Sequence, residues 1–184
     1  MKMLTHRDPV SENPPFDLEL TRQVLRLEDD ETEQDSVIEN IAWTAASEIE
    51  QIGQLALLTQ SIRVTIFDPK LDVGLRLPIG PADDGNTPTV TIDGEAYTDF
   101  EFLGGNRPYI QWKHGLFDLR PSRISIEYLA GFGDDVTAIP RDLQQAIMDQ
   151  AALLFLVRGE PDKRLHSMSP HLMRIAAKYR GVQV

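Results

Sequence analysis

The sequence predicts an α+β fold, because it contains strand-like and helix-like patterns in separate parts of the chain. The segment 124–129 alternates apolar and polar side chains, which is typical of a strand buried on one face. From Leu143 to Phe155, apolar residues recur at helical spacing, which predicts one long C-terminal helix with a buried stripe. The two patterns do not alternate as strand-helix-strand units, so a doubly wound nucleotide-binding fold is not expected.

A glycine turn joins this strand to this helix. Gly131 and Gly133 permit backbone angles that residues with side chains avoid, so the chain can change direction there. Pro140 suits the first turn of the helix that follows, because its φ angle is already helical. Gly159 and Pro161 predict where that helix ends.

The N-terminal third predicts two helices after an irregular segment. Residues 1–16 contain three prolines among polar residues, so we expect an irregular arm. Residues 17–27 predict a short amphipathic helix with Asp17 as its N-cap. The acidic run 28–35 predicts a loop. A capping box then predicts the start of a second helix over 36–53.

The middle of the chain predicts a small, mainly antiparallel sheet. Apolar alternation over 62–66 and 73–79 predicts two strands, each followed by a proline-containing turn. The segment 89–103 predicts a hairpin around an Asp-Gly turn. A further short strand over 109–112 is expected to pair with 123–129.

The length of 184 residues slightly exceeds that of one typical domain, so we expect one compact domain with extensions. We place the N-terminal arm at 1–16, the central domain at 17–160 and a basic C-terminal tail at 161–184. Within the tail, residues 169–180 predict a short terminal helix whose apolar positions are interleaved with basic ones.

Charge is distributed unevenly along the chain. Residues 1–100 carry 7 basic and 20 acidic residues, a balance of −13, whereas residues 101–184 carry 11 and 9, a balance of +2. Residues 163–184 contain no acidic residue, which suggests an acidic partner for the tail. The alternative is a solvated terminal helix. The net charge of −11 argues against a protein that grips DNA as a whole.

Composition favours a protein made in the cytoplasm. No run reaches the ~18 apolar residues of a membrane span, and the N-terminus lacks the apolar core of a signal peptide. The chain contains no cysteine, so disulfides and thiolate metal sites are excluded. We therefore expect no membrane contact.

The motifs of enzymes and of metal or cofactor sites are absent or incomplete. Gly131 and Gly133 follow a strand, but Val136 stands where a dinucleotide-binding motif has its third glycine. The acidic run 28–35 lacks the glycine and the final glutamate of a calcium loop. No zinc-protease or serine-hydrolase motif occurs, so we assign no catalytic residue, metal or cofactor. No metal-ligand spacing relates the four histidines, which are His6, His114, His166 and His171.

An apolar cluster follows the strand predicted at 109–112. Trp112, Leu116, Phe117 and Leu119 lie in a segment, 112–119, that we expect to be a loop, where large apolar side chains are unusual. Two interpretations stay open: these residues cap the core of the sheet, or they form an exposed patch that contacts a neighbouring subunit.

The order of these pieces resembles the head-tail connector, or adaptor, proteins of tailed phages and related gene transfer agents. The resemblance extends over about residues 17–180 and is most specific in the strand, the glycine turn and the helix that begins at a proline. The segments that carry it are the Asp29-Asp30 loop, LALLTQSIRVTIFDP at 55–69, LPIGP at 77–81, ISIEYLAGFG at 124–133, IPRDLQQAI at 139–147, Arg158-Gly159, and HLMRIAAKYR at 171–180.

The resemblance implies a structural virion protein without catalysis, located in the neck and assembled in the host cytoplasm. Such proteins form a ring, here expected to be dodecameric, that docks beneath the portal and above a stopper or tail-completion protein. DNA passes through the ring without specific binding. An acidic wall would repel DNA phosphates, so we expect acidic residues to line the channel.

The resemblance also suggests roles for particular residues. The tail from Ser169 to Arg180 is expected to extend from the globular part and to bind the portal, and Trp112, Leu116 and Phe117 are the expected subunit interface. The predicted portal-binding residues are Leu172, Ile175 and Tyr179, which would be buried there, and Arg174, Lys178 and Arg180, which would pair with portal acids.

Two other function classes remain open. One is a small-ligand or nucleotide-binding hydrolase that uses the Gly131 turn, with His114 as an acid or base. The other is a different neck protein, such as a stopper or tail terminator, for which we expect a mainly β structure.

Overall fold

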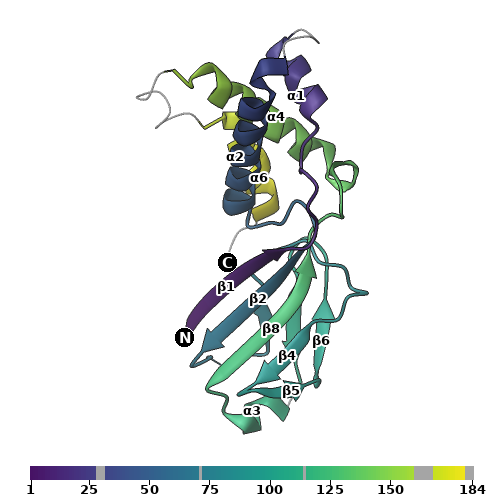
Figure 1. Ribbon diagram of the computed structural model, residues 1–184. Coiled ribbons are helices and arrows are strands. Elements are labelled where there is room, and N and C mark those ends of the chain that lie inside the picture. Colours follow the sequence, from purple (N-terminus) through teal and green to yellow (C-terminus); the bar gives the residue numbers. More distant parts are fainter. Residues whose placement is uncertain (28–31, 71, 114, 160–167, 181–184) are drawn as a thin grey trace. The chain divides into compact units, whose positions relative to one another are not determined.

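The computed structural model describes residues 1–27, 32–70, 72–113, 115–159 and 168–180 (Figure 1). Their contacts divide the chain into two compact units. A β unit comprises Met1–Ser11 and Leu58–Phe132, and a helical unit comprises Glu12–Leu57 and Gly133–Val184. The predicted α+β class is confirmed. The predicted Asp29-Asp30 loop, His114 and His166 lie outside the described residues.

The β unit contains two antiparallel sheets. In spatial order, the five-stranded sheet consists of β1 (Lys2–Pro9), β2 (Gln60–Phe67), β8 (Arg123–Ala130), β4 (Thr89–Ile92) and β5 (Glu95–Tyr97). The three-stranded sheet consists of β3 (Gly74–Arg76), β7 (Tyr109–Trp112) and β6 (Phe100–Leu103). A short helix, α3 (Gly115–Leu119), follows β7.

Alternate residues of the central strands form the core of the β unit. Val64 of β2 lies opposite Ile126 of β8, and both side chains are fully buried. Tyr128 is also buried; its hydroxyl donates to the Ile79 carbonyl at 2.8 Å, and burial raises its pKa. The other buried residues of these two strands are Ile62, Ile66, Ile124 and Ala130. The predicted alternation over 62–66 and 124–129 is confirmed.

Residues 2–9 form a strand, so the prediction of an irregular arm over 1–16 was wrong for this part. β1 pairs with β2 from Lys2 opposite Phe67 to Pro9 opposite Gln60. Six of its eight side chains are exposed, so the sequence carries no apolar alternation from which to predict a strand. Backbone pairing with a strand about sixty residues away holds it in place.

The pairing predicted for residues 109–112 was also wrong. β7 lies between β3 and β6, whereas β8 has β2 and β4 as neighbours. The predicted Asp-Gly hairpin forms between β4 and β5, but the chain leaves that sheet after Tyr97, and β6 joins the other sheet. Of the strand predicted over 73–79, only Gly74–Arg76 is paired. Local pattern identified these strands but not their partners.

The helical unit consists of α1 (Leu18–Leu25), α2 (Asp35–Gly53), α4 (Arg141–Leu156) and α6 (Pro170–Arg180), with short 3₁₀ turns η1 (Thr32–Gln34) and η2 (Val136–Ala138). The predicted N-cap is confirmed, because the Asp17 side chain accepts from the Leu20 amide at 3.1 Å. The capping box at Ser36 does not form, since α2 begins at Asp35 without a side-chain cap.

One core joins the longer helices, because α2, α4 and α6 all pack against one another. Alanines let α2 approach its neighbours closely. Arg22 of α1 is almost fully buried and pairs with Asp35, at 2.9 Å from both carboxylate oxygens, which joins α1 to the start of α2. The buried apolar residues are Ile38, Ala42, Ala45, Ala46 and Ile49 of α2, Leu143, Ala146, Ile147 and Ala151 of α4, and Leu172, Ile175 and Ala176 of α6.

Within the described ranges, no helix combines the length and the apolar composition needed to cross a membrane.

Candidate assembly surfaces

Helix α6 carries the residues predicted to bind a portal, and it packs in the helical unit. The prediction that this segment extends from the globular part was therefore wrong for the chain by itself. Leu172 is 0% exposed and Ile175 is 4% exposed, because α6 packs against α2 and α4. The apolar stripe of the helix is thus already used within its own unit.

The first turn of α4 holds the C-terminal end of α6. Asp142 accepts hydrogen bonds from Lys178 Nζ at 2.7 Å and from Tyr179 Oη at 2.9 Å. Burial opposes ionisation of Asp142, but these hydrogen bonds and the Lys178 charge outweigh it and lower the pKa of the carboxyl. Burial, together with the hydrogen bond to Asp142, raises the pKa of Tyr179 to about 12. This cluster keeps one carboxylate charged and two residues of α6 bound to it.

The remaining residues of the predicted portal-binding set, Arg174 and Arg180, are exposed. Lys178 is paired with Asp142, although its side chain is 66% exposed. The set therefore separates into residues that hold α6 in place and basic side chains that a partner can reach.

A second polar cluster holds the N-terminal end of α6. The buried Gln150 side chain of α4 donates to Glu48 Oε2 of α2 at 2.8 Å and accepts from the Ser169 amide at 2.8 Å. Beside it, His171 Nδ1 lies 2.5 Å from Asp149 Oδ2. Burial raises the pKa of Glu48, and the hydrogen bond from Gln150 only partly offsets this effect. The charged form of Glu48 is therefore less favourable in the folded protein than in the unfolded chain.

We expect Glu48→Gln to raise the melting temperature at pH 7. A raised folded pKa means that ionised Glu48 destabilises the fold above its ordinary pKa of 4.5. The amide has no charge to bury, and its oxygen can still accept from Gln150. The stabilisation should shrink as the pH falls, because native Glu48 itself becomes protonated. Thermal unfolding of both proteins between pH 3.5 and 7 checks this. Glu39→Gln, at an exposed position of the same helix, is the matched control. A gain that is independent of pH would contradict the explanation.

The apolar cluster after β7 is partly inside the β unit. Trp112 is 6% exposed and contacts Tyr97 and Phe100 edge-on, and Leu116 of α3 is 0% exposed. Phe117 and Leu119 reach the surface, at 39% and 53% exposure. These positions favour the first of the two interpretations, in which the cluster caps the sheet core. The subunit-interface role of the three residues stays a prediction, and Phe117 is the side chain best placed for it.

A groove that the sequence did not reveal lies in the β unit, between the β4–β5 hairpin and β6. Its volume is about 390 Å³. Its apolar lining includes Val90, Tyr97, Phe100 and Phe102, and Asp84 lies at its edge. In the sequence, the groove corresponds to the acidic segment 82–105, in which Phe100 and Phe102 occupy alternate positions. That pattern predicts a strand but not the cavity beside it.

The glycine turn after β8 has no geometry for a phosphate. At Gly131 a β-carbon would lie 2.5 Å from the Leu58 carbonyl, so the turn is closed by backbone. Helix α4 begins only at Arg141, so the turn does not open into a helix N-terminus. Within the described residues, no three His, Asp or Glu side chains are grouped to hold a metal ion.

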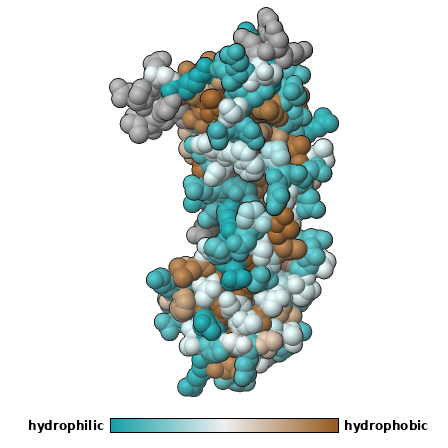
Figure 2. All heavy atoms as spheres, viewed as in Figure 1, coloured by the Kyte–Doolittle hydropathy of each residue, from teal (hydrophilic) through white to brown (hydrophobic). Residues whose placement is uncertain are grey.

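Large apolar side chains also reach the surface of both units (Figure 2). In the β unit they include Leu4 and Val10, near β1, and Leu103 at the end of β6. In the helical unit they include Trp43 of α2, Leu156 of α4 and Met173 of α6. Exposed apolar groups dispersed in this way are common on protein surfaces, so none of them identifies a partner by itself.

No protein-family model matches the chain, and no characterised protein matches it by sequence. Solved structures do match over nearly the whole length. A chain in the neck of an empty GTA particle, computed with C6 symmetry, has a TM-score of 0.76 at 21% identity and covers 98% of this chain and 97% of its own. This chain has the fold of that neck chain. A chain in the neck of a native GTA particle, computed with C12 symmetry, has a TM-score of 0.73 at 19% identity, covering 98% and 97%.

A third match is a chain in the virion of a native gene transfer agent particle, with a TM-score of 0.72 at 22% identity, covering 97% of this chain and 96% of that one. Because the matched chains are covered almost completely, the shared neck-chain fold includes both the β unit and the helical unit. It agrees with the family that the sequence resembles.

Proposed function

We propose that this chain is a structural protein of a virion neck, a head-tail connector that acts by assembly and not by catalysis. The observation that carries the proposal is the match, over 98% of the chain, to a chain in the neck of a gene transfer agent particle. Fold alone does not imply function. Here the fold agrees with the connector motifs in the sequence, which were identified independently of it.

The proposed assembly is a homo-oligomeric ring of twelve copies. The matched necks were computed with C6 and C12 symmetry, and a twelve-membered ring satisfies both, because twelvefold symmetry contains sixfold symmetry. A ring requires head-to-tail contacts between two different surfaces of each copy. In this proposal the ring docks under a portal, continues the DNA channel and meets a stopper or tail-completion protein below. DNA passes through without specific binding.

The proposed portal contact uses the reachable basic residues of α6. Arg174 and Arg180 are exposed, whereas Leu172 and Ile175 hold the helix in its unit. A portal surface that carries carboxylates would pair with these side chains at the rim of the contact. About a third of the described residues are in α-helices, which disfavours the mainly β stopper or terminator alternative.

Deletion of the gene, in a strain that produces the particles, tests the proposal. We expect separate heads and tails in electron micrographs, and few joined particles. Complementation with the unaltered chain should restore joining, and Arg174→Glu with Arg180→Glu should restore it poorly. Lys70→Glu with Arg76→Glu, which makes the same charge change at exposed positions of the β unit, is the matched control. Joined particles in normal number without the gene would overturn the proposal.

A further inference from the structure

Strand β1 is an edge of the five-stranded sheet, and within the described residues no other strand pairs with its outer side. In the antiparallel sheet, residues of β1 alternate between bonding β2 and pointing away from it. The Val10 amide donates to Thr59 O, which continues the ladder and fixes this alternation: even-numbered residues of β1 bond β2. The Asp68 amide donates to Ser122 O, so even-numbered residues of β2 bond β8 and its odd-numbered residues bond β1. This agrees with the alternation in β1, because each even-numbered residue of β1 lies opposite an odd-numbered residue of β2. Met3 and Thr5 therefore direct their N–H and C=O groups outward.

Strand β6 is an edge of the three-stranded sheet, as β3 is, and the groove lies beside β6. The Lys113 amide donates to Asp99 O, so odd-numbered residues of β6 bond β7. Phe100 and Phe102 therefore direct their N–H and C=O groups away from β7, and both residues line the groove. An incoming strand would find free backbone groups and an apolar floor at the same place.

The two edges have opposite charge. Residues 2–9 carry Lys2 and Arg7 against the single carboxylate of Asp8. At β6, Glu101 is exposed, Asp99 pairs with Lys113 at 3.7 Å, and Asp84 lines the groove beside the strand. Two β1 edges would repel each other, and so would two β6 edges, whereas β1 and β6 attract. The charges therefore favour a contact between unlike edges.

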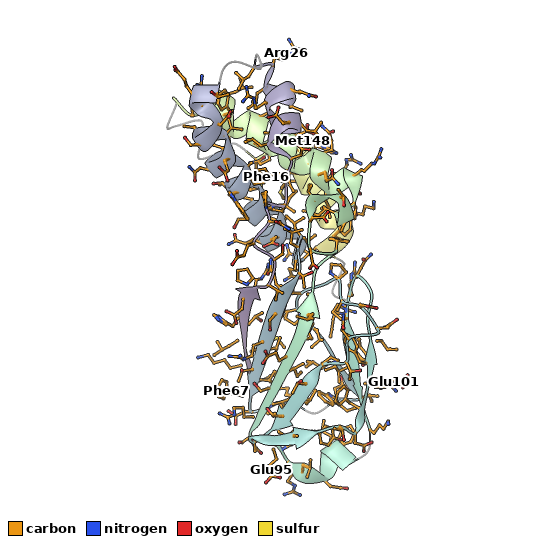
Figure 3. The ribbon with its side chains drawn as sticks, turned by 45° about the vertical axis from the view of Figure 1, so that its right-hand side comes forward. Phe16, Arg26, Phe67, Glu95, Glu101 and Met148 are labelled. Atoms are coloured by element: carbon orange, nitrogen blue, oxygen red, sulfur yellow. The ribbon has the colours of Figure 1, made fainter. Side chains whose placement is uncertain are left out.

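The edges also lie on opposite sides of the β unit. Figure 3 shows Phe67, which is opposite Lys2 in the sheet, on one side and Glu101 of β6 on the other. A copy that offers one edge therefore keeps the other free for the next copy. This is the geometry of a head-to-tail contact that can repeat around a ring.

We propose that β1 of one copy pairs with β6 of the next copy and covers the groove beside it. The occupant of the groove is thus a second copy of this chain. Long exposed edge strands are normally protected from such pairing by prolines, bulges or many charges. β1 has no proline before Pro9, and its charged residues Lys2, Arg7 and Asp8 lie near its two ends, so residues 3–6 are left without a charge or proline that would block a partner. This inference rests on the proposed ring and names its subunit contact.

Carbodiimide cross-linking of unaltered particles tests the contact, because it joins only amines and carboxylates that touch. We expect mass spectrometry of the dimer-sized product to find Lys2 joined to Asp84, Asp99 or Glu101. Lys2 is opposite Phe67 in the sheet, and Phe67 and Glu101 are on opposite sides of the β unit, so a link between Lys2 and Glu101 must connect two copies. Lys113, whose Nζ lies 3.7 Å from Asp99 Oδ1 of the same copy, is the positive control for the reaction.

A second measurement uses the absence of natural cysteines. In complemented particles, Leu4→Cys with Glu101→Cys in one chain should give a ladder of covalent oligomers with a short bismaleimide, whereas each single variant should stay monomeric. Dimers from Leu4→Cys alone, or neither kind of link in particles that contain the chain, would overturn the β1–β6 contact and leave the neck proposal intact. Particles that lack the chain would overturn the neck proposal itself.

Discussion

Gly131→Ala is expected to destabilise the β unit by about 3 kcal/mol, because it combines backbone strain with a close contact to backbone atoms. Gly131 has a φ of +139°, a conformation that residues with a β-carbon rarely adopt. The added carbon would also lie 2.5 Å from the carbonyl carbon and oxygen of Leu58, which belong to the backbone. The Gly131 amide donates to Pro81 O at 2.8 Å, so the turn cannot move away without losing this bond.

Two other glycines separate the causes of this loss. Gly94→Ala, at a φ of +97° with open space around it, should cost only about 1 kcal/mol, for backbone conformation alone. Gly159→Ala introduces neither a positive φ nor a close contact, so it should leave the stability nearly unchanged. Urea unfolding followed by circular dichroism measures all three variants. If Gly131→Ala were no worse than Gly94→Ala, the close contact with Leu58 would not be the cause.

Leu172→Ala is expected to destabilise the helical unit by about 3 kcal/mol, because it removes a fully buried side chain and leaves a cavity. Leu172 is in the first turns of α6, which packs between α2 and α4. We expect earlier urea unfolding and faster amide hydrogen exchange over residues 170–180. Amide hydrogen exchange in the β unit should not change, because the loss of stability is confined to the helical unit.

Met173→Ala is the control for this loss, since Met173 is the neighbouring residue and is 44% exposed. It should change stability by less than about 0.5 kcal/mol. If both variants lost the same amount of stability, the buried apolar side chains of α6 would not be what holds it in the helical unit. The helix would then be free to leave its unit, as the sequence alone had suggested for a portal-binding tail.

The roles of the candidate site residues followed only partly from the sequence. Composition identified α6 as basic on one side and apolar on the other, which is correct. It did not reveal that Leu172 and Ile175 face α2 and α4, since the apolar stripe of a helix does not specify its partner. The groove beside β6 was missed for a similar reason. Cavities form between elements, so no single element records them.

The sequence by itself determined the elements with strong local signals. The Asp17 cap, the alternation in β2 and β8, the Asp-Gly hairpin and the glycine turn at Gly131 all follow from short-range conformational preferences and burial patterns. Each of these signals acts within about ten residues of chain.

Only the tertiary structure decided which elements meet. β1 became a strand because β2 offers it an edge, and β7 joined β3 and β6 because β4 already pairs with that edge of β8. Backbone hydrogen bonds between strands are the same for every sequence, so pairing depends on which edges remain free once the core has formed. The proposed contact between copies uses the same property, because β1 and β6 are edges that one chain leaves open.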